Sequence, residues 1–528
     1  MKKLSKKTIR RASVIVLSAA LATGLTVAAF ATTETTSGGS AAAQGSTPPA
    51  MPQGMQGGTP PAMPSGGMGG ANTMTYDYSG TLTGALTVDG EAKTSDGETY
   101  TADTADENAV LTENAGTLTM TSATLNKSGD DTNGDNCNFY GLNSVVLSVG
   151  SGSADYISDS SLNATSEGSN GIFATDNGTV YANNDSITTS AGNSRGLDAT
   201  YGGTIVANNM TITTAGDHCA SIATDRGGGD ISVTNSSLST AGSGSPLLYS
   251  TGDIEVNNVT GTSTGSQIAG MEGLNTILIH NSVLESKNTA KTASDPMADG
   301  IIIYQSTSGD AESKTGTGAT FQAVDSTLKS AITEGTMFYF TNTSANAVLK
   351  NTTLDFDSSK ASLITVQGND SNNWGTAGSN GATVNFTGIG ETMTGNIDVD
   401  TISTLNLYLL NGTTYTGAVS ISANSVNTSA TEAPVTVNVD ADSKWVVTGN
   451  STVTNLNAAD GSQIVDADGK TVTIIVNGAT QVSGDSAYTV TVSGTCTNTV
   501  TTGTDNAVST DLIDRTGFDS YYGVSTAF

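Results

Sequence analysis

Charged and aromatic residues recur at intervals in the middle of the chain, and together they could hold a saccharide or a cation. If neighbouring repeats stack, these residues form a polar patch on one face. The candidate binding residues are Arg195, Asp198, Asp225, Arg226, Glu272, Tyr304 and Asp310. An alternative remains open, in which these side chains bond only the backbone of their own turns, as Asp does in tight corners.

A second group of residues has the spacing of a calcium loop. Asp131, Asn133 and Asp135 place oxygen atoms at the first, third and fifth positions, as in EF-hand and dockerin loops. The later positions depart from that pattern, since Asn136 replaces the usual glycine and Leu142 the usual carboxylate. Ca²⁺ is therefore the one cofactor that the sequence suggests, and a plain polar loop is the competing interpretation.

Residue types that many enzymes need are scarce. The histidines are His218 and His280, and outside residues 1–31 the arginines are Arg195, Arg226 and Arg515. Three widely spaced cysteines give no disulfide framework. These counts favour a protein without catalytic activity, although carboxylates and tyrosines remain available for acid–base chemistry.

A repeated phrase must position all these groups. It reads apolar-x-apolar-x-Asn-x-x-apolar, and its asparagines include Asn184, Asn209, Asn235, Asn258 and Asn281. A fixed period of roughly 25 residues indicates stacked repeats. The alternation of apolar and polar residues has the period of a β-strand. The sequence thus predicts an all-β protein, a right-handed parallel β-helix with three short strands in each coil.

The asparagine should turn the chain at a corner, because it tolerates the left-handed backbone conformation better than other non-glycine residues. Equivalent asparagines then lie one above another and can form a ladder of side-chain hydrogen bonds. Asp159 and Asp325 occupy the same position, and the ladder should be imperfect there because a carboxylate only accepts. Tyr181, Phe173 and Tyr201 are expected to point outward.

The ends of the chain suggest its destination. Residues 1–31 have a basic start, an apolar run and an Ala-Phe-Ala site, as in a secretory signal peptide. Residues 32–74 are a disordered linker rich in Pro, Gly and Met, residues 75–394 the β-helix, and residues 395–528 further coils and a C-terminal cap. We expect a secreted or cell-surface protein, a monomer with no transmembrane segment once the signal is removed.

The charge of the chain limits its partners. The formal net charge is −30, and loss of the six basic residues in 1–31 would bring it to −36. So negative a surface excludes nucleic acid and anionic membranes as partners and suits neutral sugars or cations.

The phrases around Ala223–Gly229, Ser245–Asp253 and Tyr304–Ala311, with Phe139–Asn143, resemble uncharacterised bacterial surface proteins with β-helix repeats that are described as adhesin-like. This resemblance implies location and fold more than mechanism. It favours a non-catalytic protein that binds glycans or host and cell surfaces. Two alternatives are a carbohydrate-active enzyme of the polysaccharide lyase type and a purely structural element of a cell wall or matrix.

Overall fold

The computed structural model describes residues 75–308, 310–311, 318–371, 374–430, 435–526 and 528. The expected signal peptide and linker, residues 1–74, lie outside the described residues.

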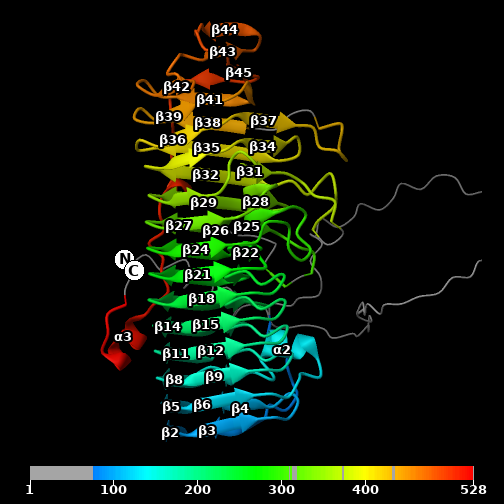
Figure 1. The fold of residues 1–528 in the computed structure, drawn as a ribbon, viewed down its shortest axis with the longest axis vertical. Helices are drawn as coiled ribbons and strands as arrows, with labels where there is room; N and C mark the ends of the chain where they lie inside the picture. The colour runs from blue at the N-terminus through cyan, green and yellow to red at the C-terminus, as the bar shows by residue number, and fades with distance from the viewer. Residues whose placement is uncertain (1–74, 309, 312–317, 372–373, 431–434, 527) are drawn as a thin grey trace, which may run out of the picture. The chain divides into compact units, whose positions relative to one another are not determined.

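Parallel strands stack into successive coils, and this confirms the predicted parallel β-helix (Figure 1). One coil consists of β10 (Ile172–Thr175), β11 (Thr179–Asn183) and β12 (Ser186–Thr189). The next consists of β13 (Leu197–Ala199), β14 (Gly203–Asn208) and β15 (Thr211–Thr214). Each strand pairs with its equivalent in the neighbouring coil, so Val180 faces Ile205 and Ile187 faces Ile212.

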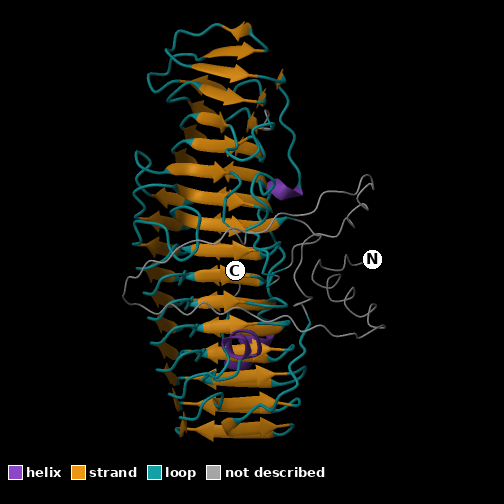
Figure 2. Cartoon of the chain, turned by 90° about the vertical axis from the view of Figure 1, so that its right-hand side faces the viewer, coloured by secondary structure: helices purple, strands orange, loops and turns teal. Residues whose placement is uncertain are grey.

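These pairings build three long sheets along the rod (Figure 2). Sheet A has 13 strands, from β1 (Gly84–Asp89) to β37 (Val419–Ser422). Sheet B has 15 strands, from β2 (Ala92–Asp96) to β46 (Cys496–Thr497). Sheet C has 10 strands, from β3 (Thr99–Ala102) to β30 (Thr353–Asp355), and a 4-stranded sheet starting at β33 (Thr392–Thr394) follows.

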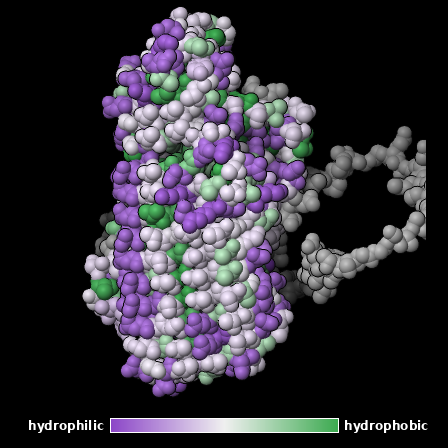
Figure 3. All heavy atoms as spheres, viewed as in Figure 1, coloured by the Kyte–Doolittle hydropathy of each residue, from purple (hydrophilic) through white to green (hydrophobic). Residues whose placement is uncertain are grey.

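The core of the rod is a continuous column of aliphatic side chains. In β11 burial alternates, with Val180 and Ala182 buried and Tyr181 half-buried, as the period of two predicts. On the face seen in Figure 3, hydrophilic residues lie among many residues of intermediate hydropathy and fewer hydrophobic ones. Of the large hydrophobic residues described, those that are exposed are Val283, Val426, Tyr521 and Val524. The rod therefore has no extended apolar surface among its described residues.

The asparagine corners have the predicted conformation. The φ angle is 63° at Asn184, 56° at Asn209 and 52° at Asn235. Asn209 Nδ2 donates to Asn184 Oδ1 at 2.7 Å, and Asn258 Nδ2 donates to Asn235 Oδ1 at 2.7 Å. The ladder forms as predicted over these steps.

The ladder is imperfect at Asp325, as predicted, and it also shifts at two places that were not predicted. Asn235 donates to Asn208 rather than to Asn209, and Asn281 donates to Asn257 rather than to Asn258. In both cases the residue just before the expected acceptor is also an asparagine, and its side-chain oxygen accepts the hydrogen bond instead. These residues are Asn208 and Asn257. Asp159 does not break the ladder, because it accepts from Asn184 Nδ2 and needs to donate nothing there. Asp325 accepts from Asn351 Nδ2, but it cannot donate to Asn281 Oδ1, so among the described contacts the ladder is interrupted between Asn281 and Asp325.

Coils continue past residue 395 and end in a small mixed sheet. Here β43 (Thr473–Val476) pairs with β44 (Ala479–Val482) in antiparallel fashion and with β45 (Thr489–Val492) in parallel. An antiparallel hairpin at the end of the stack occupies strand edges that would otherwise stay unpaired.

After β46 the chain turns back along the outside of sheet B as a strap, residues 498–528 (Figure 1). The strap bonds successively earlier strands of that sheet. Asn506 Nδ2 donates to Thr387 Oγ1 at 2.9 Å, and the Ser509 amide donates to Gln322 Oε1 at 2.8 Å. The Ile513 amide then donates to Glu255 Oε1 at 2.8 Å. The strap is a separate element that the expected coils-and-cap region did not include.

The strap ends in helix α3 (Thr516–Tyr522), which covers aromatic residues of sheet B. The Phe518 ring lies 6.0 Å from that of Tyr181, and the Tyr521 ring stacks on Tyr156 at 4.1 Å. Arg515 is buried beside this helix and donates to Ser232 O at 2.8 Å. Tyr181 therefore faces outward as predicted, but onto protein rather than solvent.

Candidate functional site

The candidate site lies on the outer face of sheet A. Loops, rather than solvent, cover this face of the sheet. Inward residues of its strands, such as Ile222 and Leu248, belong to the main core. The alternate residues face outward and lie in register along the sheet. This row contains Phe173, Asp198, Ala223, Tyr249, Gly270, Ile302 and Tyr339. Gly270 has no side chain, and it lines a cavity over this row.

A cavity of about 320 Å³ lies over this part of the sheet; we call it the lateral cavity. Loops that enter sheet A border it on one side, and the turns that leave the sheet border it on the other. Helix α2 (Gly134–Tyr140) contributes Asn138 and Phe139. Four of the predicted site residues line it: Arg195, Asp225, Tyr304 and Asp310. The other three, Asp198, Arg226 and Glu272, contact lining residues from behind.

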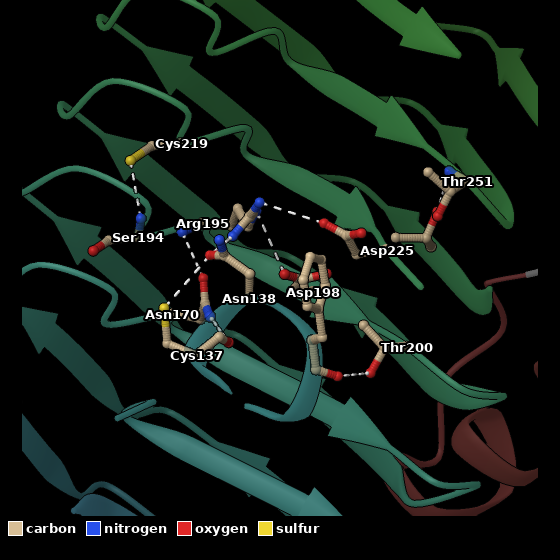
Figure 4. Close-up of polar contacts among 12 residues, drawn as sticks. Cys137, Asn138, Asn170, Ser194, Arg195, Asp198, Thr200, Cys219, Asp225 and Thr251 are labelled. Carbon is tan, nitrogen blue, oxygen red and sulfur yellow. Dashed lines mark hydrogen bonds and ion pairs between the residues drawn. The ribbon is translucent and has the colours of Figure 1, made fainter. Parts of the chain in front are cut away.

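Arg195 is the centre of the polar network (Figure 4). It is 9% exposed, and its Nη2 atom lies 3.4 Å from Asp225 Oδ2. Its Nε atom lies 3.5 Å from Asp198 Oδ2, and its Nη1 atom donates to Asn138 Oδ1. The Arg195 amide donates to Asn170 Oδ1 at 2.8 Å. The guanidinium and the amide of Arg195 together connect three successive coils and helix α2.

Burial alters the ionisation of the acids around Arg195. Burial raises the pKa of Asp225 to about 7, against the opposing charge of Arg195. Burial also raises the pKa of Asp198 well above its usual range. A single guanidinium between two buried carboxyls cannot fully stabilise both charges, so at least one of the pair holds a proton readily.

Arg226 and Asp310 form a second ion pair at the rim, with Arg226 Nε 2.6 Å from Asp310 Oδ1. The Arg226 guanidinium lies over the Phe139 ring, 3.6 Å from its centroid. These contacts tie helix α2 to the turn after β16 (Ile222–Thr224) and to the loop after β25 (Asp299–Tyr304). The loop residue Asp310 is thereby held against the body of the rod.

Aromatic side chains form one wall of the lateral cavity. Tyr304 and Trp374 stack with ring centroids 4.0 Å apart and planes 14° apart. Tyr249 OH donates to Glu272 Oε2 at 3.0 Å and lies 3.4 Å from Tyr304 OH. Burial raises the pKa of Glu272, although hydrogen bonds from Ser306 and Tyr249 oppose the shift. Tyr304 and Trp374 are 9% and 6% exposed, so the wall offers small parts of two rings and a hydroxyl group, with Glu272 behind Tyr249.

Two residues that the repeat phrase did not indicate complete the cavity. Asp295 lies in the loop between β24 (Val283–Ser286) and β25, and Trp374 lies in the loop between β31 (Ser362–Val366) and β32 (Thr383–Ile389). Asp295 is 7% exposed, and its Oδ2 atom has no hydrogen-bond partner among the described residues. Both loops are longer than the segments that join strands in the regular coils. This extra length is the only sequence signal that could have indicated that Asp295 and Trp374 belong to the site.

Expected outward residues Phe173 and Tyr201 are buried, at 0% and 7% exposure. Phe173 does face away from the core, but it packs with Leu111, Leu147 and Val149 in a separate apolar cluster. Tyr201 stacks on Tyr140 of helix α2 at 5.6 Å. Neither ring is available to a sugar, because segments before β1 and helix α2 cover this end of sheet A.

The residues of the expected calcium loop have a different role. Asn133 caps helix α2, and its side-chain oxygen accepts from the Asp135 amide at 3.0 Å. Burial raises the pKa of Asp131, which also faces the Cys137 thiol. Within the described ranges no group of three or more His, Cys, Asp or Glu residues could hold a metal ion. Calcium binding by Asp131, Asn133 and Asp135 stays a prediction that no described contact supports.

The thiols near the site are buried and structural. Cys219 Sγ accepts from the Ser194 amide at 3.0 Å, and burial raises the pKa of Cys219 to about 11 (Figure 4). Cys137 is also fully buried. A thiolate nucleophile is therefore disfavoured here.

Comparison of the chain with protein-family models, with curated proteins and with solved structures finds no match. Among the described residues, no helix is long and apolar enough to span a membrane. The chemistry of the lateral cavity must therefore be interpreted from its own residues.

Proposed function

We propose that this chain is a secreted or cell-surface, adhesin-like protein that binds a glycan, and that the lateral cavity takes one of its sugar units. The supporting observation is the combination of the stacked Tyr304–Trp374 wall with buried carboxyl groups in a single cavity of about 320 Å³. A volume of this size is within the range of small-molecule sites. Aromatic rings pack on the C–H faces of sugars, while carboxylates and amides bond their hydroxyl groups.

The charge of the cavity favours a neutral glycan over an acidic one. Asp225, Asp295 and Asp310 line it, whereas the only arginine among the lining residues is Arg195. That arginine already pairs with Asp225 and Asp198, and Arg226 pairs with Asp310. No described arginine of the site is thus left to bind a uronate, so the polysaccharide lyase alternative loses its substrate.

A specific cavity also favours a binding protein over a purely structural wall element. Structural stacking requires only the core and the asparagine corners. It does not require a buried carboxyl group in a cavity, such as Asp295, whose Oδ2 atom has no hydrogen-bond partner among the described residues and costs about 1–3 kcal/mol. We expect a single saturable site per chain rather than many weak contacts along the rod.

The test is binding to soluble neutral polysaccharides, namely xylan, mannan, galactan and mixed-linkage β-glucan, with polygalacturonate as the acidic comparison. A glycan array first selects the ligand and calorimetry then measures its affinity. We expect saturable binding to at least one neutral glycan and none to polygalacturonate. Failure to bind any neutral glycan, or tighter binding of polygalacturonate, would contradict the proposal.

Two variants locate the binding site. Trp374→Ala should lower the affinity at least tenfold because half of the aromatic wall is lost, while Trp374→Phe should retain most of it. Tyr521→Ala is the matched control, because that ring lies in the strap over sheet B and is 46% exposed. Equal affinity for Trp374→Ala and the unaltered protein would exclude the lateral cavity as the site.

A further inference from the structure

Two buried carboxyl groups line the lateral cavity from different elements. Asp225 comes from the turn after β16 and is 5% exposed. Asp295 comes from the loop between β24 and β25 and is 7% exposed. Binding alone does not require two desolvated acids in one cavity, and their surroundings differ in a way that separates their chemistry.

Two contacts of Asp225 stabilise its ionised form. Arg195 Nη2 lies 3.4 Å from Asp225 Oδ2, and the Arg226 amide donates to Asp225 Oδ1 at 2.9 Å. Both contacts stabilise a negative charge. Burial and the nearby Asp310 oppose them, and the pKa of Asp225 is raised to about 7. Asp225 therefore exchanges a proton near neutral pH, and its contacts with Arg195 and the Arg226 amide make it the better proton acceptor of the two acids.

The surroundings of Asp295 favour its protonated form. Asp299, fully desolvated at 3% exposure, has no hydrogen-bond partner for either carboxyl oxygen among the described residues. Burial, together with the charge of Asp295, raises the pKa of Asp299 well above its usual range. Burial also raises the pKa of Asp295 to about 7, although the charge of Lys291 opposes this shift. Two like charges so placed cannot both persist, so this pair retains a proton.

We propose that the lateral cavity hydrolyses a glycosidic bond of a neutral glycan, with Asp295 as the general acid and Asp225 as the general base. This inference rests on the proposed function, since the sugar must first bind beside the Tyr304–Trp374 wall. It replaces the expectation of a non-catalytic protein, which depended on the scarcity of histidine and arginine.

The reaction balances with water as the only co-reactant. Asp295 gives its proton to the glycosidic oxygen as the bond from that oxygen to the anomeric carbon breaks, and the bonding electrons leave with the oxygen. A water molecule attacks the anomeric carbon while Asp225 takes one of its protons. The products are a sugar with a new reducing end and a free hydroxyl on the leaving unit, and proton exchange with solvent restores both acids.

Arg195 acts as a positioning residue in this scheme. It holds the Asp225 carboxylate and, through Asn138, connects it to helix α2. Arg195 is engaged with both Asp198 and Asp225 and does not contact the sugar in this scheme. Its replacement should therefore alter the ionisation of Asp225. Arg195→Gln is accordingly expected to lower kcat and to shift its dependence on pH.

The experiment uses the chain with residues 1–31 removed and the neutral glycan that binds best, with reducing ends measured over time. Asp225→Asn and Asp295→Asn should each lower kcat at least 100-fold while glycan affinity changes less than fivefold. Asp96→Asn, an exposed residue of β2, is the control with unchanged turnover. Circular dichroism melting verifies that each variant is folded.

The outcomes separate the two proposals. Binding without release of reducing ends overturns hydrolysis and leaves glycan binding intact, while absence of any binding overturns both. Release of reducing ends that survives in both Asn variants would place the catalytic groups elsewhere and refute the assignment of Asp225 and Asp295.

Discussion

Replacing Asp155 by asparagine should stabilise the rod at neutral pH. Asp155 lies in β8 (Ala154–Ser158), in register with Leu118 and Val180, which face the core. It is fully buried, and Thr112 Oγ1 donates to its Oδ1 atom at 2.5 Å. Its Oδ2 atom has no hydrogen-bond partner among the described residues. A carboxylate in this position is costly, so burial raises the pKa of Asp155 to about 7.

The magnitude follows from the difference between the folded pKa and the ordinary value of 3.8. Each unit corresponds to about 1.36 kcal/mol, so the full penalty is about 4 kcal/mol. Below about pH 4 both the folded and the unfolded chain carry the proton, and no penalty applies. As the pH rises from about 4 to about 7, only the unfolded chain loses the proton, and folding stability falls. Above about pH 7 the penalty is complete.

Asp155→Asn removes this titration. At pH 8 the variant should be about 2 to 4 kcal/mol more stable than the unaltered protein, because the new amide group finds no acceptor and loses part of the gain. At pH 4 the two proteins should be similar, or the variant slightly weaker. Other buried acids, such as Asp185 and Glu391, titrate equally in both proteins, so the difference isolates position 155.

Hydrogen exchange with mass spectrometry is the suitable assay, because a stacked repeat need not unfold in one step. The opening free energy of peptides covering β8 is compared between the two proteins at pH 5, 6, 7 and 8. Asp96→Asn, which alters an exposed carboxylate, should show no such trend. A difference between Asp155→Asn and the unaltered protein that does not change with pH would refute the reasoning.

Two further changes test the corners and the strap. Asn209→Ala should destabilise its coil by about 1 kcal/mol, because alanine is strained at φ 56°. Asn209→Gly should cost less, although it also removes the hydrogen bond to Asn184. Equal losses of opening free energy in the two variants, measured by hydrogen exchange, would mean that the ladder bond dominates. Arg515→Ala should release the strap, because several charged hydrogen bonds worth about 1.5–3 kcal/mol each are lost, whereas Arg515→Lys should retain part of the docking. Faster proteolysis of residues 498–528 in Arg515→Ala with an intact rod is the expected result, and unchanged protection would exclude Arg515 as the anchor.

The repeated phrase was sufficient to predict the fold because one local rule recurs in every coil. Alternating apolar residues place Val180 and Ala182 in the core, and Asn184 turns the corner. The same rule could not locate the strap. Residues 498–528 lack the phrase, and their position depends on long-range contacts such as Arg515 with Ser232, which have no local signature.

The candidate site was predictable in part for a similar reason. Equivalent positions in neighbouring coils lie close together, so Arg195, Asp198 and Asp225 meet as their spacing indicated. Asp295 and Trp374 lie in loops that interrupt the period, where spacing in the sequence no longer gives distance in space. Exposure was also misjudged at Phe173, because the period of a strand gives the direction of a side chain but not what lies over it.

The lateral cavity lies where loops and a helix interrupt the regular surface of the β-helix. On sheet A, helix α2 and the loops carrying Asp295 and Trp374 extend outward from the coils, and Gly270 of the sheet lies among the residues that line the cavity. The rigid sheet fixes the distance between acids that come from different coils, while the loops exclude water and raise their pKa values. Regular coils thus supply the positions, and the irregular insertions supply the desolvation that makes those positions chemically useful. The part of the chain that departs from the repeat is therefore where its activity should be sought.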